Sequence, residues 1–245
     1  MMLSIASTDA SKRAASAGAT RELLLIWQNP KNRKFRVAGL LTYSADEGYS
    51  FRYQPTIASD PDFFPLAEYP DLEHEYVASH LPPFFANRVM STRRGSYPQY
   101  LDWMGLDVNA ANLPIELLVR TGASKATDTF HIVEKPARSA TTFTSRFFVS
   151  GIRHQPGAEV TIEDIKSGEE LQLQPEPDNP KNPDAHMVLR SHDERIGWVP
   201  DWLCGEVAAM AAEGWSYRVI AEQVNPSAPA HIRVLCRLEA VRFER

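Results

Sequence analysis

A polar segment near the middle of the chain restricts the possible folds more than any other feature. Residues 135–145 contain Pro136 and three threonines, and they separate two self-contained hydrophobic patterns. A chain of 245 residues has room for two domains. We therefore predict a first domain over residues 21–137, a linker over 138–145 and a second domain over 146–245. Residues 1–20 are rich in Ala, Ser and Thr, and we expect a disordered leader there.

The first half has the pattern of an antiparallel sheet with short helices. Tyr49, Phe51 and Tyr53 alternate with polar residues, the two-residue period of a half-buried strand. Further strands are predicted at 22–27, 35–43 and 129–133. Prolines punctuate residues 55–83 and predict loops there. Pro83, Pro98 and Pro114 each stand where a short helix can begin, and we expect Gly105 and Gly122 to end the last two.

The second half has the pattern of a small β-barrel with one main helix. Strands are predicted at 147–152, 171–173, 187–189, 195–199, 216–224 and 232–241. We expect Asp201 to cap the main helix and Gly214 to stop it, and Thr161 to cap a shorter helix. The predicted fold class of the chain is α+β.

Composition and charge limit the classes of function. No stretch approaches 18 consecutive apolar residues and no secretory signal opens the sequence, so we expect a cytoplasmic protein without membrane contact. Residues 147–245 carry 10 Lys and Arg against 16 Asp and Glu, a net charge of −6. Proteins that grip nucleic acid usually present a basic face, so this balance argues against tight binding by the second half.

The motifs of common enzymes and cofactor sites are missing from the sequence. His74 and His80 are better explained as surface residues than as metal ligands, and His192-Asp193-Glu194 as a polar turn than as an acid–base cluster. Cys204 and Cys236 lie on apolar faces and are predicted to be buried rather than nucleophilic. We predict no enzyme activity, no cofactor and no metal site.

Residues 22–134 resemble the N-terminal subdomain of HipA-type Ser/Thr kinase toxins. The resemblance rests on Phe51-Arg52-Tyr53-Gln54-Pro55, the run from Leu81 to Asn87 (LPPFFAN) and the run from Pro114 to Leu118 (PIELL). The kinase body is absent from this chain. The resemblance therefore implies a separate antitoxin subunit that binds and restrains a HipA-type kinase lacking this subdomain. A DNA-binding antitoxin is a further candidate partner.

The segment after Phe85 is the predicted contact with such a kinase. Arg88, Met90, Arg93 and Arg94 follow the helix that begins at Pro83. Arginine and methionine are frequent in protein interfaces, and the arginines could pair with carboxylates of a kinase cleft. The alternative is a solvated basic loop.

Residues 146–242 resemble a HIRAN domain. The matching pieces are the run from Phe148 to Arg153 (FVSGIR), the run from Glu176 to Pro180 (EPDNP) and the run from Ile196 to Pro200 (IGWVP). The resemblance implies an OB-like or SH3-like barrel that captures the 3′ end of single-stranded DNA. In this sequence, Arg153 and His154 occupy the places of an Arg–aromatic pair, and Lys181 and Asn182 replace a Tyr-Asp pair.

These replacements predict weak strand binding with little preference for a free 3′ end, and Asn179-Pro180 can also be explained as a rigid turn. Two hypotheses follow. The leading prediction is a non-enzymatic antitoxin that restrains a HipA-type kinase. The alternative is a single-stranded DNA binding module that acts through the HIRAN domain.

Overall fold

The computed structural model describes residues 20–110, 112–122 and 128–243. The leader predicted over residues 1–20 lies outside these ranges except for Thr20. The described residues form two separate sheets in which every strand pairing is antiparallel, joined to a few mostly short helices. This mixed architecture confirms the predicted α+β class.

The first sheet has five strands in the order β4-β3-β2-β1-β5. Its strands are β1 (Arg21–Gln28), β2 (Phe35–Ser44), β3 (Gly48–Tyr53), β4 (Tyr76–Ala78) and β5 (Phe130–Glu134). Four of them lie where the sequence predicts strands. β4 was not predicted, because it is a three-residue strand inside the proline-rich segment.

Four short helices belong to the first part: η1 (Pro55–Ile57), α1 (Pro83–Ala86), α2 (Tyr97–Trp103) and α3 (Leu113–Thr121). All four have proline at the first or second position, and Pro83, Pro98 and Pro114 stand there as predicted. Gly105 and Gly122 follow α2 and α3 with φ of 59° and 64°, the left-handed backbone that ends a helix. Aromatic rings around the fully buried Phe51 fill the core of the first sheet.

The second sheet has the order β10-β9-β8-β11-β12-β7-β6. Its strands are β6 (Ala137–Arg138), β7 (Thr142–Phe148), β8 (Glu170–Pro175), β9 (His186–Leu189), β10 (Arg195–Trp198), β11 (Ser216–Val224) and β12 (Val234–Val241). Ser150, just after β7, pairs with Trp198 of β10 through two backbone hydrogen bonds of 2.8 Å. This bridge joins the first strand of the ring to the last, so β7 to β12 form a closed six-stranded barrel.

Four helical segments accompany the barrel: η2 (Ile152–His154), α4 (Ala158–Asp164), α5 (Asp201–Ala212) and η3 (Ala230–Ile232). Two predicted helix starts are wrong. Thr161 lies in the middle of α4, because Gly157 with φ of 79° starts the helix earlier. Pro200 stands at the N-cap of α5, which places Asp201 in the first turn. Gly214 follows α5 with φ of 75°, as predicted.

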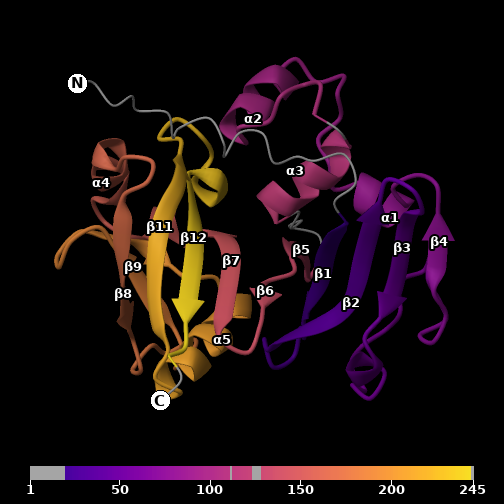
Figure 1. Cartoon of the computed structure of the whole chain (residues 1–245), viewed down its shortest axis with the longest axis horizontal. Coiled ribbons are helices and arrows are strands. Elements are labelled where there is room, and N and C mark those ends of the chain that lie inside the picture. The colour runs from indigo at the N-terminus through magenta and orange to yellow at the C-terminus, as the bar shows by residue number, and fades with distance from the viewer. Residues whose placement is uncertain (1–19, 111, 123–127, 244–245) are drawn as a thin grey trace, which may run out of the picture.

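The two parts meet along a shared interface. Figure 1 shows the first sheet and the barrel side by side, with β6 in the connection between them. β6 and β7 occupy part of the expected linker 138–145, so this segment is more ordered than the sequence predicts. A buried cluster also joins the parts: Leu101, Met104 and Leu117 from the first contact Ala228 and Ile232 from the second.

The division into two domains stays a prediction, which limited proteolysis can test. Ser139 and Ala140 are exposed between β6 and β7, so we expect elastase to cut there first. The nicked halves should stay folded and elute together in size-exclusion chromatography, because the shared cluster is not cut. Uncut protein is the control. Unfolding of either half on cleavage would instead show one indivisible domain.

Candidate nucleic-acid interface

Trp198 fixes the position of η2, which carries Arg153 and His154. The bridge between Ser150 and Trp198 holds the two backbones together, and Gly151 follows with φ of 69°. A Cβ atom on Gly151 would lie 2.7 Å from the Trp198 ring, so only glycine lets the indole pack on this turn. The chain enters η2 directly from this contact.

The same indole holds the loop that carries Lys181 and Asn182. The Trp198 Nε1–H donates to a Glu176 carboxylate oxygen at 2.8 Å, and that oxygen also accepts from Asn179 Nδ2 at 3.0 Å. Asn179 Oδ1 in turn accepts the backbone N–H of Lys181 at 3.0 Å. The two motifs from Glu176 to Pro180 and from Ile196 to Pro200 therefore form one hydrogen-bonded unit.

Arg153 and His154 lie together on the surface, as the sequence predicts. Both are exposed, and Arg153 Nε–H donates to His154 Nε2 at 3.1 Å. A planar guanidinium and a planar imidazole are thus presented side by side.

Lys181 and Asn182 differ in their availability. Lys181 is exposed. The Asn182 amide is used within the protein, because its Nδ2 donates to Asp201 at 3.3 Å and its Oδ1 accepts the Asp184 N–H at 2.9 Å. Asn182 therefore supports the loop through these two bonds, and its role as a strand contact stays a prediction.

Charge pairing occupies five of the nine Lys and Arg side chains in residues 142–241. Five arginines form ion pairs with carboxylates: Arg146, Arg190, Arg218, Arg233 and Arg237. Among the described residues, no ion pair involves Arg153 or Lys181. These two cations can therefore meet an external phosphate without first breaking an internal pair.

Arg88, predicted as a kinase contact, lies inside the protein instead. Its side chain is 1% exposed, forms an ion pair with Asp128 and lies 4.4 Å from the centre of the Phe84 ring. The guanidinium turns inwards because Asp128 and the aromatic face satisfy it there. Arg93 and Arg94 are exposed in the turn before α2, and Met90 is half-buried. Met90, Arg93 and Arg94 stay predicted contacts.

Groups with catalytic or metal-binding chemistry are scarce in the described residues. No cluster of three His, Cys, Asp or Glu side chains could hold a metal ion there. Cys204 and Cys236 are buried as predicted, and burial raises the pKa of the Cys204 thiol to about 12. His192 and Asp193 are almost fully exposed, as in a polar turn. No helix in the described part is long and apolar enough to cross a membrane.

Comparison with known proteins identifies the second part of the chain. Residues 142–241 match the HIRAN domain family. A solved structure of a protein from Lactobacillus plantarum is 17% identical, covers 44% of this chain and 100% of its own, and has a TM-score of 0.35. The crystal structure of the HIRAN domain of human HLTF is 18% identical, covers 42% of this chain and 79% of its own, and has a TM-score of 0.31. No curated protein matches the chain.

The family match begins at Thr142, at the first residue of β7, and leaves the first sheet outside it. The resemblance of residues 22–134 to HipA-type kinases therefore stays a prediction. The match agrees with the motifs at Phe148, Glu176 and Ile196, which the structure joins around Trp198. Residues 142–241 of this chain are thus a HIRAN domain.

Proposed function

We propose that this chain binds single-stranded DNA through its HIRAN domain and performs no chemistry on the strand. One observation carries the proposal: Trp198 anchors both the turn with Arg153 and His154 and the loop with Lys181. The exposed groups on these two segments are the ones that single-strand binding uses. Phosphates pair with cations, and bases stack on planar side chains.

Each exposed residue has a role in this proposal. Arg153 and Lys181 contact phosphates, since neither is held by a carboxylate in the described structure. His154 stacks on a base through its planar ring, and the bond from Arg153 holds that ring in place. The acidic balance of the domain keeps the affinity modest.

DNA binding is favoured over restraint of a HipA-type kinase for two reasons. The family match lies on the domain that the DNA hypothesis requires. The kinase hypothesis loses one of its four predicted contacts, because Arg88 is buried. Met90, Arg93 and Arg94 stay available to a protein partner, but no match supports that use.

Replacing Arg153 or Lys181 by alanine should weaken binding of a labelled oligothymidine several-fold at low salt, as measured by fluorescence anisotropy. Each variant should also reduce the slope of log affinity against log salt by about 0.7, the loss of one phosphate contact on a single strand. Arg195→Ala is the matched control, because Arg195 is exposed at the opposite end of β10 from Trp198. Equal effects of all three substitutions, or no binding at low salt, would overturn the proposal.

The same assay tests recognition of the strand end. We expect oligonucleotides with a 3′ hydroxyl and with a 3′ phosphate to bind equally, because the Asn182 amide is occupied by Asp201 and Asp184. Loss of binding on 3′ phosphorylation would show that this pocket reads the end despite the replacements.

A further inference from the structure

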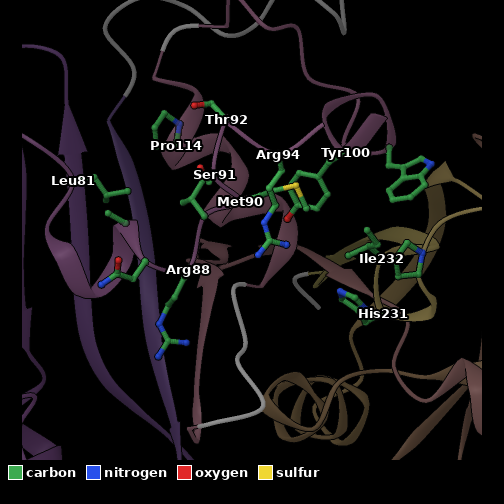
Figure 2. Close-up of a pocket in the computed structure, with 15 residues that line it drawn as sticks. Leu81, Arg88, Met90, Ser91, Thr92, Arg94, Tyr100, Pro114, His231 and Ile232 are labelled. Atoms are coloured by element: carbon green, nitrogen blue, oxygen red, sulfur yellow. The ribbon is translucent and has the colours of Figure 1, made fainter. Parts of the chain in front are cut away.

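A cleft of about 790 Å³ lies between the two parts of the molecule. One wall comes from the loop between α1 and α2 and from α2 itself, and the other comes from residues 229–232 around η3 (Figure 2). The cleft therefore exists only where segments more than 100 residues apart in sequence come together.

The lining of this cleft suits a polyanion with planar groups. None of the 15 lining residues is Asp or Glu, although the chain carries 31 acidic residues and a net charge of −5. Tyr100 and Trp103 contribute aromatic rings, and Arg94 contributes an exposed cation. Figure 2 shows the Arg94 guanidinium directed into the space between Arg88 and His231. Unlike Arg88, Arg94 forms no ion pair among the described residues.

The walls of the cleft are fixed to one another. The Trp103 carbonyl accepts hydrogen bonds from Gln223 Nε2 at 2.5 Å and from Asn225 Nδ2 at 2.6 Å. These bonds tie the end of α2 to the barrel. Ile232 of η3 belongs to the buried cluster that also contains Leu101. A ligand would therefore meet a preformed site, which lowers the cost of binding.

The cleft adjoins the proposed DNA surface. η3, which supplies His231 and Ile232 to the cleft, is in contact with η2, which carries Arg153 and His154. Arg233, the residue after η3, pairs with Glu159 of α4 and donates to the Ala228 carbonyl at 2.7 Å, and both contacts hold the η3 turn in place. The two surfaces therefore adjoin each other through the contact between η2 and η3.

We infer that the cleft is a second subsite for the same DNA strand. Nucleotides beyond those on the HIRAN surface would pass η3, pair a phosphate with Arg94 and stack a base on Trp103 or Tyr100. This inference rests on the proposed function. It assigns the first part of the chain a share in DNA binding that the HIRAN match alone does not give it.

The test compares short and long oligothymidines, of about 4 and about 16 nucleotides, the range of site sizes found on one OB fold. Arg94→Glu should lower the affinity for the long strand at least about fivefold and leave the affinity for the short strand unchanged, since only the long strand reaches the cleft. Arg93→Glu is the matched control: Arg93 is the neighbouring exposed arginine, it lies outside the cleft, and the charge change is the same. Trp103→Leu tests stacking and should also lower the affinity for the long strand only. Thermal unfolding checks that this variant is folded.

The outcomes separate the inference from the proposed function. In one outcome, Arg153→Ala lowers the affinity for both strands, while Arg94→Glu and Arg93→Glu have equal effects. The cleft is then not a subsite, and the proposed DNA binding by the HIRAN domain stands. If Arg153→Ala changes the affinity for neither strand, the proposed function is wrong, and the inferred second subsite for the same strand is wrong with it. The inference is supported if Arg94→Glu and Trp103→Leu lower the affinity for the long strand alone, while Arg153→Ala lowers the affinity for both strands.

Discussion

Replacing Gly197 by alanine should lower the free energy of unfolding by about 2–4 kcal/mol, the combined cost of overpacking and of two weakened backbone hydrogen bonds. The added Cβ would lie 2.4 Å from the Ser150 carbonyl oxygen and 2.7 Å from a Val149 methyl carbon. The Ser150 backbone cannot retreat without stretching its two bonds to Trp198, which close the barrel. The substitution therefore acts on the most constrained junction of the HIRAN domain.

Urea unfolding followed by circular dichroism measures this effect, and the chain provides a matched control. Gly205 lies in α5, is exposed, and has no atom within 4 Å of an added Cβ. Gly205→Ala should raise stability by about 0.5–1 kcal/mol through helix propensity. Gly197→Ala should also reduce DNA affinity, because the junction positions η2. Equal unfolding midpoints for the two variants would contradict the close contact.

Replacing Phe51 by alanine should destabilise the first part of the chain by about 3–5 kcal/mol, the usual cost of truncating a buried phenylalanine. The ring is fully buried, with the rings of Tyr69, Tyr53 and Phe85 at 4.9, 5.0 and 5.4 Å. Its edge also lies over Gly39, where a Cβ atom would come within 2.6 Å. Truncation of Phe51 therefore removes the ring at the centre of this aromatic cluster.

Phe64→Ala is the control for this prediction, since the same atoms are removed from a side chain that is 79% exposed. Its effect should stay within about 0.5 kcal/mol. Thermal unfolding of both variants gives the comparison. Similar losses of stability in the two variants would mean that the Phe51 ring is not a main contributor to the stability of the first sheet.

Local patterns predicted the regular elements well. The alternation from Tyr49 to Tyr53 placed β3 correctly, because one face of that strand is buried and the other is not. Gly122 and Gly214 marked helix ends, because each adopts a left-handed backbone. The predicted start of α4 was wrong, because Thr161 is a residue type that often caps helices, whereas α4 starts at the left-handed Gly157. β4 was missed because a three-residue edge strand has too few residues for a period.

The candidate site was predictable only as far as the motifs extend. Arg153, His154 and Lys181 followed from the HIRAN resemblance, and the structure shows all three exposed. Arg88 was misjudged because nothing local reveals that Asp128, 40 residues away, neutralises it. The cleft residues Trp103 and His231 gave no signal, since packing between the two parts alone brings them together.

The bridge between Ser150 and Trp198 also determines how the HIRAN domain can meet other proteins. β7 has one side on β12, and its other side pairs with β6 at Phe143 and Thr144 and leads into β10 through Ser150. Within the described residues, the barrel therefore leaves no long row of unpaired backbone groups for an added strand. Partners at this domain must be recognised by side chains. In the first sheet, the β5 edge is partly covered, because the Ile132 N–H donates to the Gly122 carbonyl at 2.9 Å and β5 contacts α3 and β7. Strand addition to that sheet is therefore expected at β4, its other edge strand.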